Sequence, residues 1–287
     1  DANLKGVAAL LLSMFIFSLQ EVVIKLIGGK YPILEMVLLR SIVAMPFTLL
    51  FFRMEGGRGL PKTQQPLLEY VRGLAQFLSY TFFFMGVATL PLAQVSAIRY
   101  SGPLMITLLS MLLGDKVKPT TLLALVVGFG GLFVVLKPTG SGLSLGSIFI
   151  LLSTFTYAIG VILTRMLRDH DSSATMSYFS SLFYLAAAAV LAPIVLMIGP
   201  REGADPSLQF LLRQWVMPTT LHLAMMMGLG LVWASGMFFV ARAYTLAKTS
   251  VVTPFEYASL PLSAMWGYVI FGDVPAVQMI IGAMVAV

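Results

Sequence analysis

The chain has 287 residues, of which 59% are hydrophobic and only 10% are charged, and its formal net charge is +6. Because soluble domains carry about 25% charged residues, this composition excludes an ordinary soluble protein and indicates an integral membrane protein. The absence of cysteine excludes disulfides, thiol catalysis and thiolate metal sites. The basic residues are scattered among the loops between apolar runs, which favours orientation signals over a nucleic-acid partner.

Repeated apolar runs predict membrane-spanning α-helices of about 20 residues rather than the alternating strands of a barrel. We expect ten spans, of which the last has only 14 residues in the sequence and should extend further. In chain order, the expected spans are Leu4–Ile27, Ile33–Phe52, Leu67–Leu90, Ala93–Leu113, Thr120–Leu136, Leu143–Met166, Ala174–Ile198, Val216–Leu246, Ser250–Phe271 and a run that starts near Val274.

A long internal repeat organises the chain. The segment QVSAIRYSGPLMITLLSMLLGD (Gln94–Asp115) recurs 158 residues later as VTPFEYASLPLSAMWGYVIFGD (Val252–Asp273), with Ser, Pro, Leu, Gly and Asp in register. Weaker matches relate the first expected span to the sixth and the third to the eighth, at offsets of 140 and 156. We therefore expect two five-helix repeats, residues 1–139 and 140–287, joined at the linker-like KPTGSG. Because five is odd, the second repeat must be inverted in the membrane, a plan that many secondary transporters use.

Charge in the loops predicts how the chain is oriented. Lys and Arg are more numerous in the loops on the side of the N-terminus than in the loops on the opposite side. By the positive-inside rule, both termini of this multi-pass protein should lie in the cytoplasm.

The paired ends PLMITLLSMLLGD and PLSAMWGYVIFGD carry a resemblance to a known family. Together with the following glycine-rich helix, which contains Gly128, Gly130 and Gly131, they resemble the drug/metabolite transporter superfamily in its branch of two EamA-type repeats. The resemblance covers essentially the whole chain, although the family's usual Glu after the glycine is Asp in both halves. Within this superfamily the sequence is similar to the bacterial aromatic amino acid exporters. The resemblance implies export of aromatic amino acids and related amphipathic compounds across the bacterial inner membrane, with no cofactor.

Two prolines occupy equivalent positions in the long repeat. Pro103 and Pro261 each remove a backbone hydrogen bond within an expected span, so we expect each to kink its helix. A carbonyl freed at membrane depth must face protein or water. The pair therefore predicts kinks that shape a central cavity, although a nearby Ser or Thr hydroxyl could repair an ordinary kink.

Arg99 and Glu256 lie well inside expected spans, one position apart in the repeat register. An ionised side chain at a helix centre costs about 2.5–3.5 kcal/mol, so each needs a partner or a wet cavity. A structural cross-axis ion pair is one interpretation, and contact with the carboxylate or ammonium of a zwitterionic substrate is another. A third is that Arg99 extends its charged head to the membrane interface. An organic-cation exporter would need Glu256 unpaired, whereas a nucleotide-sugar carrier would need several buried basic residues, of which we identify only Arg99.

Further polar and aromatic residues share faces of the expected spans, which suits an amphipathic amino acid as substrate. Such residues also serve in helix packing and interface belts. The predicted substrate-binding residues are Ser13, Phe17, Gln20, Gln76, Tyr80, Arg99, Tyr100, Tyr157, Trp233, Tyr244, Glu256 and Tyr257.

An intramembrane enzyme is the main alternative class. Zinc chemistry is disfavoured because His170 and His222 stand outside any HExxH motif, and no metal site is expected. Asp115 and Asp273 lie at helix ends rather than where an aspartyl protease needs them. We therefore predict a transporter that works by alternating access, with passive export and proton-coupled antiport both open.

Overall fold

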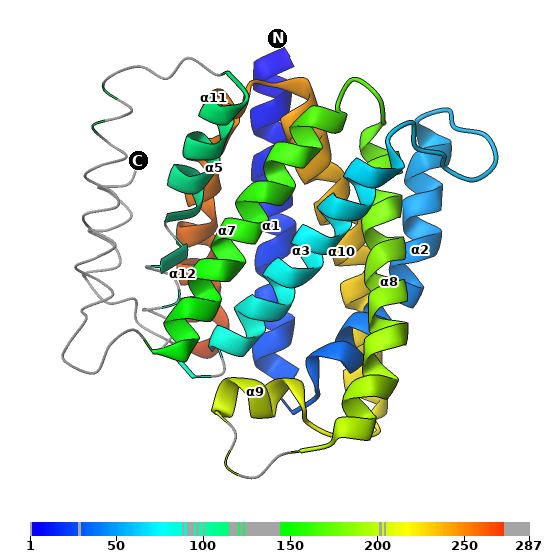
Figure 1. Cartoon of the computed structure of the whole chain (residues 1–287), viewed down its shortest axis with the longest axis vertical. Coiled ribbons are helices and arrows are strands. Elements are labelled where there is room, and N and C mark those ends of the chain that lie inside the picture. The colour runs from blue at the N-terminus through cyan, green and yellow to red at the C-terminus, as the bar shows by residue number, and fades with distance from the viewer. Residues whose placement is uncertain are drawn as a thin grey trace.

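The computed structural model describes residues 2–27, 30–87, 89–90, 95, 98–99, 101–114, 120, 123, 144–200, 203 and 205–272. Within these ranges the regular secondary structure is entirely helical (Figure 1). The elements are α1 (Ala2–Ile27), α2 (Ile33–Met54), α3 (Pro66–Val87), α5 (Ser101–Leu112), α7 (Leu145–Leu167), α8 (Ser173–Ile198), α9 (Pro206–Leu211), α10 (Thr220–Leu246), α11 (Thr249–Val252), the 3-10 helix η1 (Thr253–Ala258) and α12 (Ser259–Phe271).

Five of the described helices, α1, α2, α7, α8 and α10, are long and apolar enough to cross a membrane. Helix α3 has comparable length, but it carries the buried charges Glu69 and Arg72 near its start. The chain is therefore a multi-pass, all-helical integral membrane protein.

The expected spans agree with the described helices to within a few residues for α1, α2, α3, α7, α8 and α10. The ninth expected span, Ser250–Phe271, is not one continuous helix, because η1 separates α11 from α12. A run of apolar residues predicts depth in the membrane but not an unbroken hydrogen-bond pattern, and the continuous helix was a wrong prediction. The expected spans at 120–136 and from 274 onward, and the linker at 137–142, lie outside the described residues.

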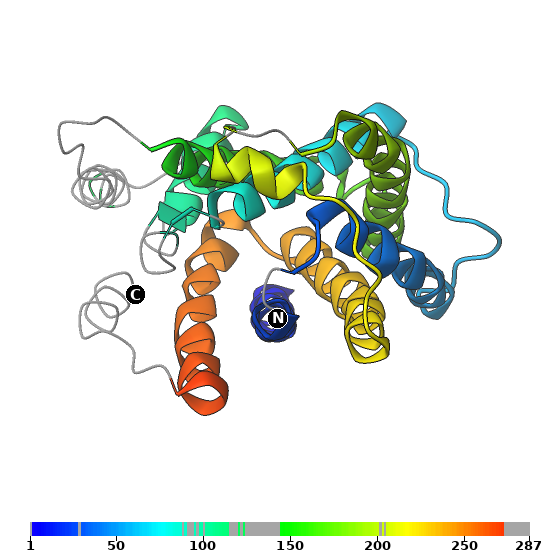
Figure 2. The same ribbon diagram turned by 90° about the horizontal axis from the view of Figure 1, so that it is seen from below.

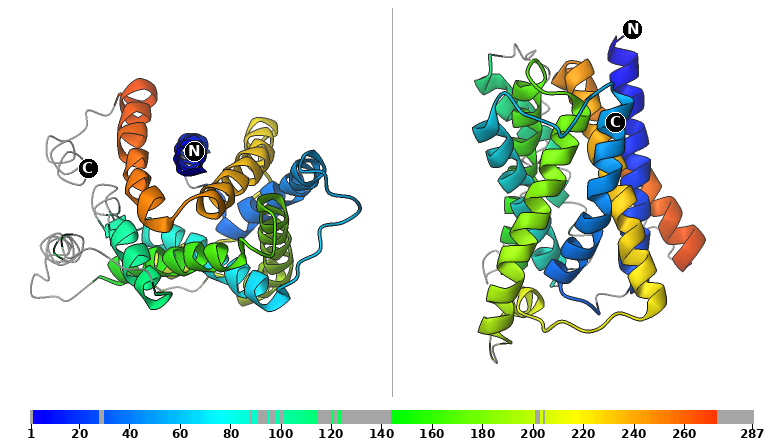
Figure 3. Two further views of the ribbon diagram at one scale, coloured as in Figure 1. Left: turned by 90° about the horizontal axis from the view of Figure 1, so that it is seen from above. Right: turned by 90° about the vertical axis from the view of Figure 1, so that its right-hand side faces the viewer.

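The helices pack as a bundle in which α1 lies along α10, α7 along α3, and α2 against both α8 and α10. Helices α1 and α7 cross the bundle in opposite directions (Figure 1). Viewed along the bundle, α1 lies between α10 and α12, and α3 and α7 lie along one side of this row (Figures 2 and 3).

Two glycines at equivalent positions of the repeats allow close contacts between helices. A Cβ on Gly6 would lie 2.6 Å from that of Ala247, just after α10. A Cβ on Gly146, 140 residues later in α7, would meet Thr89, just after α3. Each glycine therefore lets its helix pack closely against the residues that directly follow the C-terminal end of the facing helix.

At the end of the bundle where α1 begins, which we call the upper rim, a buried ion pair joins α3 to α8. The Arg72 guanidinium donates to one oxygen of Glu69 at 2.8 and 3.0 Å, and both side chains are inaccessible to solvent. Arg72 also donates to the backbone carbonyl of Met176 in the first turn of α8. The pair therefore holds two helices together as well as balancing its own charge.

Further polar bonds cross the upper rim. The Asp171 carboxylate, in the turn between α7 and α8, accepts a bond from the Thr63 hydroxyl at 2.5 Å and from the backbone N–H of Gln64 at 3.2 Å. Glu55, after α2, accepts from the backbone N–H of Ala174 at 3.2 Å. The loops of the first half of the chain are thus bonded to the start of α8.

Candidate substrate site

The Glu256 carboxylate is held inside the bundle by two tyrosine hydroxyls. Tyr157 on α7 donates to Glu256 Oε1 at 2.8 Å, and Tyr244 on α10 donates to the same oxygen at 2.5 Å. Glu256 is only 9% exposed, and Tyr244 is fully buried. Among the described residues, no Lys or Arg lies within 4.0 Å of this carboxylate. The site therefore presents a buried acid whose described partners are neutral donors.

The local backbone explains how Glu256 comes to face these rings. It lies in η1, where Pro254 cannot donate a backbone hydrogen bond, and Ser259 returns its hydroxyl to the Glu256 carbonyl at 2.9 Å. Pro261 is the third residue of α12, in a first turn where a missing N–H costs little. In η1, the Glu256 side chain therefore reaches tyrosines of α7 and α10, while the Glu256 backbone carbonyl is bonded to Ser259.

The first half repeats part of this arrangement. Ser101, the register equivalent of Ser259, donates its hydroxyl to the carbonyl of Ile98 at 2.7 Å. Pro103 is buried in α5. Because residues 96, 97 and 100 lie outside the described part of the chain, the kink at Pro103 stays a prediction.

Arg99 is half exposed and forms no ion pair with Glu256, although its charge lies close enough to stabilise that carboxylate. Its side chain is 49% exposed, and its guanidinium pairs at 3.4 Å with Glu21 of α1 and lies 4.9 Å from the ring centre of Phe83. The expectation that Arg99 is the buried basic residue was wrong, because apolar flanks place a residue in a helix without saying which face it occupies.

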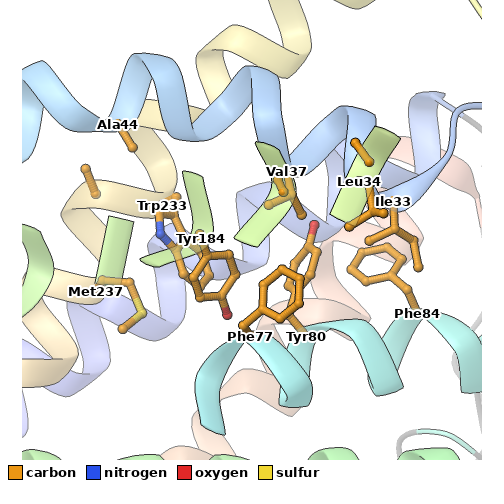
Figure 4. Packing of buried hydrophobic residues seen from close by; sticks show 13 residues of the cluster. Ile33, Leu34, Val37, Ala44, Phe77, Tyr80, Phe84, Tyr184, Trp233 and Met237 are labelled. Carbon is orange, nitrogen blue, oxygen red and sulfur yellow. The ribbon is translucent and has the colours of Figure 1, made fainter. Parts of the chain in front are cut away.

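The buried basic residue at the centre of the bundle is Arg40 of α2, which the sequence reasoning missed. It is inaccessible to solvent, and its guanidinium carbon lies 4.0 Å from the ring centre of Tyr80, 4.1 Å from Trp233 and 5.2 Å from Tyr184. Its Nη1 donates to Gln20 Oε1 at 3.4 Å. We call Arg40 with these four neighbours the Arg40 cage, and Figure 4 shows the three aromatic rings within one buried cluster.

A signal for Arg40 was present in the sequence. It stands in the run ILEMVLLRSIVAMPF, and an ionisable residue inside an apolar span is a functional candidate by default. The position of Gln20, which we did predict, identifies the same cage from the facing helix.

The structure brings several of the predicted residues together. Gln20, Tyr80 and Trp233 surround Arg40, and Tyr157 and Tyr244 hold Glu256.

Phe17 packs against the apolar clusters of both centres, with its ring centre 6.0 Å from that of Trp233. Ser13 is buried and bonds to the carbonyl of Leu10. Gln76 accepts a bond from Ser180 at 2.9 Å. These contacts identify Phe17 as the side chain between the two centres.

Two predicted residues and the expected cavity are outside what the structure describes. Tyr100 lies outside the described residues, as does the side chain of Tyr257. The hollows that the described residues form include one of about 390 Å³ between α1 and α10 and one of about 320 Å³ at the upper rim, around Asp171. The central cavity therefore stays a prediction.

Comparisons with known proteins establish the class of this protein. Residues 4–137 match the EamA-like transporter family. The chain is 24% identical to the S-adenosylmethionine uptake transporter of Rickettsia prowazekii, over 99% of this chain and 90% of that protein. This match and this relative support an EamA-type transporter of the drug/metabolite transporter superfamily.

Other relatives of the chain are named as transporters too. The chain is 28% identical to the pseudopaline exporter CntI of Pseudomonas aeruginosa, over 100% of this chain and 95% of that one. It is 27% identical to the riboflavin transporter of Vibrio cholerae, over 89% and 80%. A solved structure described only as "Crystal structure of protein" shares the fold, with a TM-score of 0.68 at 18% identity over 99% and 95% of the two chains.

These relatives indicate a transporter rather than an enzyme, and their names differ in both substrate and direction. The chemistry of the candidate site is therefore the guide to which substrate this protein carries. That site holds one buried acid and one buried base, both lined by aromatic rings.

Proposed function

We propose that this transporter exports amino acids, aromatic ones foremost, and related amphipathic molecules across the bacterial inner membrane. The observation that carries the proposal is the Glu256 carboxylate, which is buried and bonded to the hydroxyls of Tyr157 and Tyr244. A substrate ammonium would supply the positive partner that a buried carboxylate otherwise lacks.

The walls of this centre suit an aromatic side chain. Tyr157 and Tyr244 lie in one apolar cluster, against which Phe17 also packs. Sites for amphipathic molecules are mostly apolar, with a few polar groups that fix orientation. Here the rings would hold the side chain of the amino acid while the carboxylate holds its amine.

The helix packing supports alternating access between two inverted repeats, residues 1–139 and 140–287. The repeat offsets make α1 the counterpart of α7 and α3 the counterpart of α10. The contacts α1–α10 and α7–α3 are then two copies of one interface that joins the first helix of each repeat to the third helix of the other. We propose ten membrane helices in total with both termini in the cytoplasm, and rocking of one half against the other.

Export and proton coupling are parts of the same proposal. A relative at 28% identity is named as an exporter, which supports the outward direction. Glu256 is the group that would carry a proton, since it is buried between helices of the proposed pathway and can exchange a substrate ammonium for H⁺. Passive export would use the same carboxylate without the exchange.

Export of organic cations is a second candidate function. It is favoured by the same observation, because no basic residue among those described pairs with Glu256. A cation exporter would need this acid and would have no use for a basic centre.

The test is uptake into proteoliposomes of radiolabelled phenylalanine, tryptophan, threonine and phenethylamine, with and without a pH gradient. We expect phenylalanine and tryptophan to be carried faster than threonine, and Glu256→Gln to abolish the response to the gradient. Glu21→Gln, which removes a carboxylate that is 41% exposed, is the matched control and should behave as the wild type.

The outcomes separate the candidates. Failure to carry any of the three amino acids would reject the amino acid exporter, and transport of phenethylamine alone would leave the organic-cation exporter. A wild-type rate that ignores the gradient would exclude proton coupling.

A further inference from the structure

Several buried polar groups of the Arg40 cage meet no hydrogen-bond partner among the described residues. They are Nε and Nη2 of Arg40, the hydroxyl of Tyr80 and Nε1 of Trp233. Arg40 is 0% exposed, Trp233 is 5% exposed and Tyr80 is 8% exposed. Each of these groups can donate a hydrogen bond. The guanidinium carbon of Arg40 lies 4.0 Å from the ring centre of Tyr80 and 4.1 Å from that of Trp233.

The positive charge in this cage is also unbalanced. Among the described residues, no carboxylate lies within 4.0 Å of Arg40, and its bond to Gln20 at 3.4 Å is to a neutral amide. Aromatic faces attract a guanidinium, but they accept none of its in-plane N–H bonds. Burying a charge without a counter-charge is costly, so this centre favours an anion.

Arg72, another fully buried arginine, has a counter-charge in Glu69, although its Nη1 also meets no hydrogen-bond partner among the described residues. Arg72 donates twice to Glu69 and once to a backbone carbonyl. This protein can therefore place a carboxylate beside a buried arginine, and the described residues place none beside Arg40.

We propose that the Arg40 cage is the anion-binding half of the substrate site and takes the carboxylate of the transported molecule. A planar carboxylate has two oxygens, which match the paired N–H groups of a guanidinium. This inference rests on the proposed function and deepens it, because it restricts the substrates to molecules that carry both an ammonium and a carboxylate.

The packing of Phe17 connects the two centres. This ring contacts Trp233 of the cage and also packs in the cluster of Tyr157 and Tyr244. A zwitterion that engages both centres would therefore lie against Phe17. The cage also separates the two candidate functions, since a simple organic cation gains nothing from Arg40 and is repelled by its charge.

The experiment measures binding to the purified full-length protein in detergent, by the ligand-dependent shift in thermal unfolding. The probes are 3-phenylpropionate, which has a carboxylate and no amine, its neutral amide 3-phenylpropanamide, and phenethylamine, which has an amine and no carboxylate. We expect the wild type to prefer the propionate over the amide by about tenfold or more, as for hydrogen bonds to a charged group.

Arg40→Gln should abolish this preference and leave phenethylamine binding intact, while Arg40→Lys should retain part of the preference. Arg99→Gln is the matched control and should keep the full preference, since its side chain is 49% exposed. Should Arg40→Gln fail to fold, Tyr80→Phe removes a single unpartnered hydroxyl and should reduce the preference several-fold.

Equal binding of propionate and amide by the wild type, or an unchanged preference in Arg40→Gln or Tyr80→Phe, would overturn the assignment of the cage. Phenethylamine binding tests Glu256 separately. If the wild type binds 3-phenylpropionate in preference to its amide but does not bind phenethylamine, the proposed ammonium site at Glu256 is rejected and the carboxylate site at Arg40 is still supported.

Discussion

Removing the Tyr244 hydroxyl tests whether Glu256 is held as a carboxylate by charged hydrogen bonds. The Tyr244→Phe change keeps the buried ring and so creates almost no cavity, but it removes the 2.5 Å bond to Glu256 Oε1. A hydrogen bond to a charged group contributes about 1.5–3 kcal/mol, so the free energy of unfolding should fall by about that amount.

Tyr184→Phe is the matched control. Tyr184 is equally buried, but its hydroxyl donates at 2.6 Å to the neutral backbone carbonyl of Gln76. Loss of such a bond should cost only about 0.5–1.5 kcal/mol. The difference between the two variants therefore reports the charge on the acceptor.

The assay is reversible denaturation of the purified protein, with each tyrosine variant made in the wild-type and Glu256→Gln backgrounds. We expect the cost of Tyr244→Phe to shrink in the Glu256→Gln background, and the cost of Tyr184→Phe to stay the same, because only the first pair is coupled. Equal costs for the two tyrosines, or a Tyr244→Phe cost that ignores the background, would refute the reasoning.

Three further perturbations test packing and ion pairs in the same denaturation assay. Gly230→Val should lower the free energy of unfolding by about 1–3 kcal/mol, because a Cβ there would lie 2.5 and 2.9 Å from backbone atoms of α2. A Cβ at Gly228 would meet open space, so Gly228→Ala should not destabilise the protein, and equal losses in the two variants would contradict this reasoning. Arg72→Met should lower the free energy of unfolding by about 3–5 kcal/mol, because it leaves Glu69 charged and buried without its partner. Adding Glu69→Met should recover most of that loss, and a double variant less stable than the single variant would exclude this explanation. Arg99→Gln should change stability by less than about 1 kcal/mol because its ion pair is half exposed, and a larger loss would show that the pair is not a surface one.

The helices that cross the membrane could be predicted from the sequence because their signal is simple. An apolar run of about 20 residues has few alternatives to a membrane helix, since every backbone group must be bonded internally. Helices α1, α2 and α8 accordingly begin and end within a few residues of the expected bounds. The break at η1 was missed, because a run of apolar residues does not specify an unbroken pattern of backbone hydrogen bonds.

The candidate site was predicted in part. Sequence reasoning selected Glu256 from its depth in an expected span and the two tyrosines from the helix faces they share with other polar and aromatic residues, and the structure brings them together. It chose Arg99 over Arg40 because the long repeat drew attention to Arg99. Which arginine is buried depends on the face of each helix, and an apolar run on all sides carries little information about faces.

The bonds across the upper rim set a threshold for what this protein can move. Asp171 and Arg72 tie loops and helices of one half of the chain to the other, so that end of the bundle cannot part without breaking them together. A solute can shift such an equilibrium only by as much as it binds one conformation better than the other. Under the proposed rocking of the two halves, molecules that are recognised too weakly would leave these bonds intact and the upper rim closed.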